Sequence, residues 1–344
     1  MSKIICMYLP QFHEFEENNR WWGKGFTEWT CVNRAKSLTD GHVIRKPHCD
    51  IGYYNLLDKS ARKKQACMAK EYNIYGFCYY HYWFYDKVLM EKPLELMLED
   101  GEPDLPFMLS WANEPWTRKM NGGNGEITQP QRYGDEDEWK RHLQYLIKYF
   151  KNPNYIKINN KPVFCIYRMS IIDNCISRIN YWKEAIKDYG FDGLHVVMTL
   201  GVWPKEEALY LLPYVDAVFD FYPNFLRHPS IVSYEIENIA FCEMKDAYSK
   251  ILNENSIHQN HYKGMMVGFD NSPRSPKKAS VFINNSPELF YHAMKLQFQQ
   301  SHSEFIFVNS WNEWGEQAAI EPDELYGYAF LEKIRKGTKC LKIL

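Results

Sequence analysis

Two carboxylates near the end of the chain have the residue type and spacing that acid–base chemistry requires. Glu313 and Glu316 lie three residues apart, separated by Trp314 and Gly315. Like charges held close together raise the pKa of one partner, which leaves a protonated acid beside an ionised base at neutral pH. Cleavage of a glycosidic bond uses such a pair. The structural alternative has equal weight: one loop acid, and one acid at the N-terminus of the next helix.

The side chains that flank this pair are typical of a carbohydrate site. Asn309, Trp311, Asn312 and Trp314 surround the two acids, and an apolar run over 305–308 leads into them. Amides can hydrogen-bond sugar hydroxyls, and indole rings offer flat faces with a polar tip. A buried strand that ends in such a cluster is expected to deliver it to a pocket.

Short apolar runs and helical patterns alternate along the whole chain, eight of each. The expected strands are 4–8, 74–80, 106–111, 162–167, 194–200, 216–221, 263–269 and 305–308. The expected helices are 58–72, 93–99, 135–150, 175–189, 205–212, 234–252, 287–300 and 325–336. This alternation predicts parallel strands joined by crossover helices, closed into a (β/α)8 TIM barrel. The main alternative, an open doubly wound sheet, has no Gly-rich phosphate loop to support it.

The chain length of 344 residues suits one barrel, so we expect residues 1–344 to form a single catalytic domain with long β-to-α loops. The longest of these loops, about 10–56, is rich in Trp, Gly, His and Asn. Tryptophan argues against disorder there, and loops of this length in a compact domain are usually functional.

Active sites of TIM barrels gather at the C-terminal ends of the strands. The polar and aromatic residues that follow the expected strands or lie in the first long loop are therefore candidate substrate-binding residues. They are Gln11, His13, Trp29, His81, Tyr82, Trp83, Trp111, Asn113, Glu114, Trp116, Arg168, Trp203, Tyr222 and Asp270. For Glu114 the alternative is an ion pair with Arg118. For His13 and His81 it is a half-buried, hydrogen-bonded imidazole.

Composition argues against several other classes of function. The net charge of −2 gives no case for nucleic acid or an anionic membrane. No apolar run approaches the length of a membrane span, and the apolar N-terminal segment is too short for a signal peptide. The nine scattered cysteines are expected to be free thiols in a reducing, cytoplasmic setting. The sequence predicts no cofactor and no metal site, and it does not indicate the oligomeric state.

Several motifs in order resemble the WbsX-type proteins of bacterial surface-polysaccharide loci. The resemblance extends over nearly the whole chain. Its motifs are Tyr8-Leu9-Pro10-Gln11-Phe12-His13, Trp22-Gly23-Lys24-Gly25-Phe26-Thr27-Glu28-Trp29, Gly76-Phe77-Cys78-Tyr79-Tyr80, Trp111-Ala112-Asn113-Glu114-Pro115-Trp116-Thr117-Arg118, Lys161-Pro162-Val163-Phe164, Trp311-Asn312-Glu313-Trp314-Gly315-Glu316 and Ile320-Glu321-Pro322-Asp323.

That family is itself similar to glycoside hydrolase family 99, the endo-α-mannosidases, which are (β/α)8 barrels. The resemblance implies that Glu313 is the base and Glu316 the general acid. It also implies retention of configuration through a 1,2-anhydro sugar, formed when the base deprotonates the 2-hydroxyl of the substrate. Gly315 is a departure, because the mannosidases have histidine at this place.

Three hypotheses about function follow. The first is a retaining, glycosidase-like enzyme that acts on a bacterial glycan through Glu313 and Glu316. The second is a glycosyltransferase or transglycosylase in O-antigen or capsular polysaccharide biosynthesis. The third is a non-catalytic glycan-binding barrel. All three predict a glycan or sugar partner.

Overall fold

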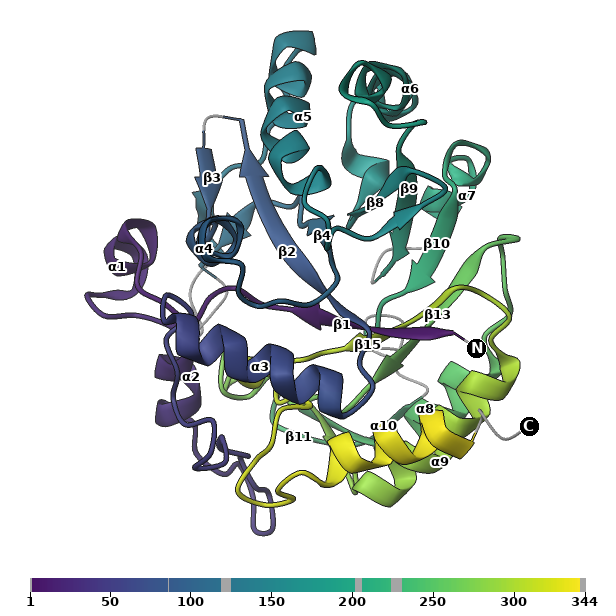
Figure 1. Ribbon diagram of the computed structural model, residues 1–344. Helices are drawn as coiled ribbons and strands as arrows, with labels where there is room; N and C mark the ends of the chain where they lie inside the picture. Colours follow the sequence, from purple (N-terminus) through teal and green to yellow (C-terminus); the bar gives the residue numbers. More distant parts are fainter. Residues whose placement is uncertain (1, 86, 119–124, 202–205, 224–230, 341–344) are drawn as a thin grey trace.

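The computed structural model describes residues 2–85, 87–118, 125–201, 206–223 and 231–340 (Figure 1). Its centre is a closed barrel of eight parallel strands. They are β1 (Lys3–Tyr8), β2 (Gly76–Phe84), β4 (Phe107–Trp111), β8 (Lys161–Ile166), β9 (His195–Leu200), β10 (Ala217–Asp220), β13 (His261–Met266) and β15 (Phe305–Asn309). β1 pairs with both β2 and β15 and so closes the barrel. The predicted TIM barrel is confirmed, and the open-sheet alternative is wrong.

Helices connect successive barrel strands on the outside. They are α3 (Lys59–Glu71), α4 (Lys92–Asp100), α5 (Glu136–Phe150), α6 (Cys175–Ala185), α7 (Glu206–Leu209), α8 (Met244–Asn253) and α9 (Pro287–Gln300), and α10 (Ala329–Cys340) follows the last strand. In Figure 1, α5, α6 and α7 lie on one side of the strands and α3, α9 and α10 on the other. The barrel strands are mostly apolar and almost entirely buried, because both of their faces are covered.

Local signals set several of these boundaries. The side chain of Asp135 accepts a hydrogen bond from the backbone N–H of Glu138 and caps α5, and Ser286 caps α9 in the same way at Leu289. Gly190 ends the helical segment after α6 with a φ of 91°, a conformation that glycine adopts without strain.

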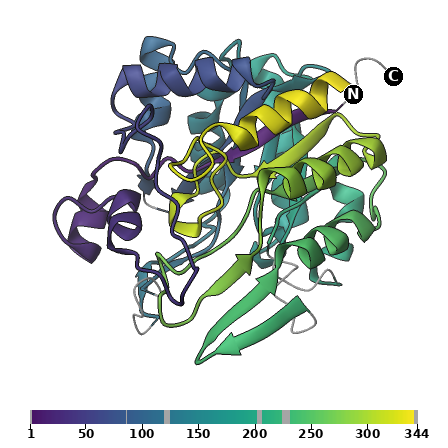
Figure 2. The same ribbon diagram turned by 90° about the horizontal axis from the view of Figure 1, so that it is seen from below.

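Most of the remaining elements lie at the end of the barrel where β1 ends, whereas β7 pairs with the first residues of β8 at the other end. α1 (Glu16–Trp22) and α2 (Glu28–Arg34) interrupt the long first loop, and both views place them beyond the end of β1 (Figures 1 and 2). Short strands complete the chain: β3 (Lys87–Leu89), β5 (Trp116–Thr117), β6 (Ile127–Gln129), β7 (Lys157–Ile158), β11 (Val232–Ile236), β12 (Ile239–Glu243) and β14 (Ser280–Ile283).

The expected helix over 234–252 is wrong in its first half. β11 and β12 form an antiparallel hairpin there, with Glu237 at a φ of 54° in the turn, and β14 adds to β12 in parallel. A helical period fits the apolar and polar residues of this stretch almost as well as a period of two, so residue type alone does not distinguish helix from hairpin here. The helix proper is α8.

The last helix begins at Ala329 rather than near residue 325. The carboxylate of Asp323 accepts hydrogen bonds from the backbone N–H groups of Leu325 and Tyr326, which makes a local turn in place of a helical start. Trp203 and part of the expected helix over 205–212 lie outside the described residues. That residues 1–344 form one domain stays a prediction.

In the described part of the chain, no helix is both long and apolar enough to cross a bilayer. The eight cysteines whose side chains are described are free thiols, six of them buried.

A buried pair of histidines makes acid sensitivity a testable property of the fold. The Nε2 atoms of His81 and His142 are 2.9 Å apart, and burial lowers the pKa of His81 to about 3 and that of His142 well below its usual value. Above the ordinary histidine pKa of about 6.5 the two histidines are neutral in both the folded and the unfolded chain, so they make no contribution to the pH dependence of stability. Below it the unfolded chain gains protons that the folded chain does not, so stability falls as the pH falls from about 6.5 toward 3.

Replacing His142 by Gln is therefore expected to reduce the slope of the unfolding free energy against pH in this range by about 1.4 kcal/mol per pH unit. Urea unfolding at several pH values between 4 and 7 (roughly the titration range of histidine) measures the slope. The exposed His302 provides the control, because His302→Gln should leave the slope unchanged. A slope that is the same in wild type and His142→Gln would contradict the assignment.

Candidate active site

The loop after β15 carries Glu313 and Glu316 and is held by hydrogen bonds to the first strand. The amide of Asn312 bridges Leu9, accepting from its backbone N–H at 2.8 Å and donating to its carbonyl at 3.0 Å. The backbone N–H of Glu313 donates to the hydroxyl of Ser310 at 2.7 Å. Neither Asn312 nor Ser310 is exposed to solvent. The backbone that carries the two acids is therefore fixed in place.

Glu321 lies beneath this loop and orients its tryptophan. Its carboxylate accepts hydrogen bonds from the indole of Trp314, the hydroxyl of Tyr54 and the amide of Gln65, each at 2.8 Å. Burial raises the pKa of Glu321 to about 7, although these donors oppose that shift. A carboxylate suits this place because its oxygens only accept hydrogen bonds when ionised.

Glu321→Gln is expected to lower the free energy of unfolding by about 1–3 kcal/mol, because the new amide group turns a donor toward at least one of these donors. Thermal and urea unfolding measure the loss. Glu324→Gln, an exposed neighbour on the same loop, is the matched control and should unfold like wild type. Equal stability of the two variants would show that Glu321 does not hold the loop.

A single arginine joins both candidate acids to a third glutamate. The guanidinium of Arg274 contacts Oε1 of Glu28 through Nε at 2.6 Å, Oε2 of Glu313 through Nη2 at 2.7 Å and Oε1 of Glu316 through Nη1 at 2.9 Å. Glu28 opens α2, and Arg274 lies in the loop after β13. The side chain of Glu28 is fully buried, that of Glu313 is 6% exposed and that of Glu316 is 26% exposed.

This cluster shifts the pKa of Glu313. Burial raises the pKa of Glu313 to about 8; the positive charge of Arg274 works against that rise, and the negative charges of Glu316 and Glu28 add to it. This shift favours the protonated form of Glu313 near neutral pH. A carboxyl with so shifted a pKa in a cavity is a candidate for proton transfer.

Both candidate acids face a cavity of about 1150 Å³ at the C-terminal end of the barrel. Six of the residues predicted from sequence line it: Gln11, Tyr82, Glu114, Trp116, Glu313 and Glu316. Trp116 is half-buried and packs edge-on against Tyr82, with ring centroids 5.0 Å apart. It offers the cavity an aromatic surface.

The other predicted residues lie behind the wall of the cavity or at its edge, where they contact protein groups. Trp29, Trp111, Trp311 and Trp314 are buried, and Asn309 donates to the carbonyl of Tyr222 at 2.8 Å. These residues build the end of the barrel. Their predicted contacts with a substrate stay predictions.

A second group of predicted residues is engaged in side-chain pairs. Asp270 contacts His42 at 2.8 Å, and Trp83 stacks on His142 with ring centroids 4.4 Å apart. His81 also pairs with His142, which supports the structural alternative given for it. His13 is buried, and burial lowers its pKa to about 4.

Glu114 is paired, but with a different arginine from the one expected. Its Oε1 contacts Nη1 of Arg168 at 3.0 Å, whereas Arg118 contacts Glu126 at 3.8 Å. The amide oxygen of Asn113 accepts from the backbone N–H of Arg168 at 2.8 Å, which ties the ends of β4 and β8 together. The expected Glu114–Arg118 pair is therefore corrected to Glu114–Arg168.

Sequence reasoning missed Glu28 and Arg274, and also the cavity-lining Trp22, Tyr80 and Tyr167. A signal existed for both charged residues. Glu28 belongs to a motif that carries the family resemblance, and Arg274 follows the seventh expected strand within five residues of Asp270. What the sequence could not show is that the two loops meet.

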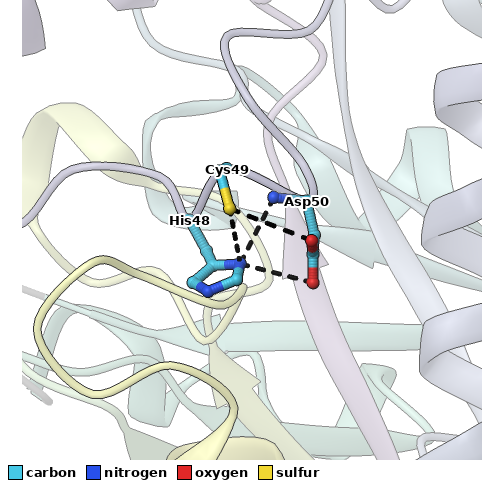
Figure 3. Close-up of side chains that lie close together, drawn as sticks. All are labelled: His48, Cys49 and Asp50. Carbon is cyan, nitrogen blue, oxygen red and sulfur yellow. Dashed lines mark hydrogen bonds and ion pairs between the residues drawn. The ribbon is translucent and has the colours of Figure 1, made fainter.

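One set of side chains in the described residues has ligand atoms close enough to hold a metal ion: His48, Cys49 and Asp50 (Figure 3). Cys49 and Asp50 are exposed. Nδ1 of His48 accepts the backbone N–H of Asp50 at 3.2 Å, and the carboxylate of Asp50 accepts from the hydroxyl of Tyr328 at 2.7 Å. These contacts explain the cluster as a local turn, so it supports no metal centre.

The barrel resembles solved structures over its full length. The GH99 endo-alpha-mannosidase from Bacteroides thetaiotaomicron superposes with a TM-score of 0.60 at 13% identity, covering 99% of this chain and 97% of that chain. A glycoside hydrolase-like protein gives 0.61 at 12% identity, covering 98% and 93%. At this level of identity the likeness shows the fold.

Two curated relatives match in sequence. The uncharacterized proteins WxcX of Xanthomonas campestris pv. campestris, strains B100 and ATCC 33913, are each 30% identical over 354 residues, which covers 98% of this chain and 49% of the relative. The chain thus spans about half the length of these relatives. The family model described as "Glycosyltransferase WbsX" matches residues 4–334, and the chain therefore belongs to the WbsX family.

Proposed function

We propose that the protein is a carbohydrate-active enzyme that acts on a glycosidic bond of a glycan, with Glu313 and Glu316 as its acid–base pair. The observation that carries this proposal is the contact of both carboxylates with one guanidinium, that of Arg274, in the lining of the barrel cavity. Two carboxyl groups that share one cation and differ in exposure fit the carboxyl pair of glycosidic chemistry.

The size and lining of the cavity favour an oligosaccharide over a single small sugar. Its volume of about 1150 Å³ exceeds the usual range for small-molecule pockets. Trp22 and Trp116 supply flat apolar surface, and Gln11, Asn271 and Glu114 supply hydrogen-bonding groups along the walls. This mixture suits a chain of pyranose rings.

In the proposed mechanism Glu313 is the base and Glu316 the acid, as the family resemblance implies. Glu316 is the more exposed of the two and faces the open cavity, where it can reach a departing oxygen. The two carboxyl groups share one proton, and the reactive form is the one in which Glu316 carries it and Glu313 is ionised. Glu313 accepts the proton of the substrate's 2-hydroxyl while that oxygen attacks the anomeric carbon, and Glu316 gives its proton to the leaving oxygen. In the second step Glu316 accepts a proton from the attacking water, and Glu313 returns its proton to the 2-oxygen as the anhydro ring opens with retention.

The experiment is a screen of the protein with mannose-configured and other oligosaccharides, read by release of reducing ends. The anomeric configuration of the first product, measured by NMR, should match that of the substrate. A product of inverted configuration would contradict the proposed route. Protein with Glu313→Gln serves as the matched blank.

A glycosyltransferase is the second candidate, and it is favoured by the description of the matching family. The exposed Lys277 and Lys278 at the edge of the cavity give it a basic side that could face a nucleotide sugar. Calorimetric titration with nucleotide sugars separates the two candidates. Tight binding that depends on these lysines would favour transfer, and its absence together with glycan cleavage would favour hydrolysis.

A further inference from the structure

Position 315 has no room for a side chain. A Cβ added to Gly315 would lie 1.7 Å from Oε1 of Glu28 and 2.8 Å from Nε of Arg274. These same two atoms form the ion pair between Glu28 and Arg274, at 2.6 Å. The volume beside the backbone of residue 315, between the two candidate acids in sequence, is therefore filled by a side-chain pair from elsewhere in the chain.

Each nitrogen of the Arg274 guanidinium has its own carboxylate partner. Nε contacts Glu28, while Nη2 and Nη1 contact Glu313 and Glu316. A planar guanidinium holds its donors in a fixed fork, so Arg274 cannot turn toward one acid without leaving another. Glu28 is fully buried at the start of α2, and its contact with Nε fixes the orientation of the guanidinium.

We propose that Glu28 and Arg274 form a positioning pair that takes the place of a side chain at position 315 and sets how Glu313 and Glu316 share one cation. The inference rests on the proposed function, because it assigns these residues a role in the acid–base pair. It makes Arg274 a positioning residue that acts through the two acids.

The groups that face Glu313 determine the sign of each substitution. They are Arg274, Glu28, Glu316 and the phenols of Tyr80 and Tyr82. Arg274 lowers the pKa of Glu313 and Glu28 raises it. Arg274→Gln should therefore raise that pKa and Glu28→Gln should lower it. A role in packing alone would not produce shifts of opposite sign.

The test is an NMR titration of the Glu313 carboxyl carbon in protein labelled with 13C at glutamate, with Glu313→Gln used to assign the signal. Each substitution should move the pKa of Glu313 by about 1–3 units, upward for Arg274→Gln and downward for Glu28→Gln. Arg141→Gln, which removes an arginine paired with Glu138 on α5, is the control and should leave the pKa of Glu313 unchanged. Shifts of the same sign, or none, would overturn the proposal.

A second measurement tests the steric half of the inference and does not depend on catalysis. Gly315→Ala should lower the melting temperature sharply in wild type, and by clearly less in a Glu28→Ala background, where the clashing carboxylate is gone. Equal losses in the two backgrounds would overturn the claim that Glu28 fills this space.

The outcomes separate the inference from the proposed function. Opposite shifts in a protein that turns over no glycan and binds none would remove the function and with it the role of the pair in catalysis, although the ion pair itself would stand. Glycan turnover with no shift in the pKa of Glu313 would remove the positioning pair alone.

Discussion

Glu313→Gln and Glu316→Gln are each expected to lower turnover of a cleavable glycan by about 10²–10⁴-fold, the usual contribution of a positioned acid or base. Glutamine keeps the shape of the side chain but cannot accept or donate the proton. Both residues line the cavity, and both contact Arg274, so either change removes one member of a coupled pair. Initial rates with the oligosaccharide that emerges from screening measure the effect.

The two variants should differ in a way that identifies their roles. A substrate with a good leaving group needs less help from an acid, so it should recover more activity in Glu316→Gln than in Glu313→Gln. Glu324→Gln, on the exposed part of the following loop, is the control and should retain full activity. Unchanged turnover in both Glu313→Gln and Glu316→Gln would exclude them as the acid–base pair.

The second large effect is on the pH profile. The rate constant kcat/KM follows the ionisation of the free enzyme, and the pKa of Glu313 is raised to about 8 by burial. If Glu313 is the base, only its ionised form is active. With a substrate whose leaving group needs no protonation, so that only the ionisation of Glu313 counts, kcat/KM should then rise about tenfold per pH unit below that pKa and level off above it.

The presence of this limb decides between the two assignments. With a substrate that needs no acid, a kcat/KM that shows no rise toward a pKa of about 8 would exclude Glu313 as the base and reverse the roles that the family resemblance implies. Rates measured on Glu28→Gln should show the limb at lower pH, since Glu28 contributes to the raised pKa of Glu313. If the pH at which kcat/KM changes is the same in Glu28→Gln as in wild type, the ionisation behind that change does not belong to Glu313.

The barrel itself could be predicted because its signals are local. Apolar runs such as Phe305–Asn309 in β15 and amphipathic segments such as Glu136–Phe150 in α5 are read directly from residue type and period. The hairpin of β11 and β12 was missed because apolar and polar residues over 232–243 fit a helical period almost as well as a period of two, and its partner β14 lies far along the chain.

The candidate site could be predicted only in part. Glu313 and Glu316 are neighbours in sequence, so their proximity was visible. Glu28 and Arg274 are 246 positions apart, and their contact depends on how two loops fold over the same end of the barrel. Gly315 was visible as a departure from the mannosidase pattern, but only the structure shows that the space beside it is filled.

The position of a residue after a strand does not tell whether its side chain faces the cavity. Successive side chains there alternate between the cavity and the wall. Tyr82 faces the cavity, whereas its neighbours His81 and Trp83 pack against His142 on α5. The alternation was available in the sequence, but the face that points inward was not.

The most direct test of the central claim is a crystal structure of the protein soaked with a mannose-configured iminosugar, beside other iminosugars of different configuration. The ring nitrogen carries the positive charge that develops at the anomeric centre, so a carboxylate pair should hold it. We predict a ring between Glu313 and Glu316, with Arg274 still in contact with both acids. A ring bound elsewhere in the cavity, with neither glutamate in contact, would contradict the account.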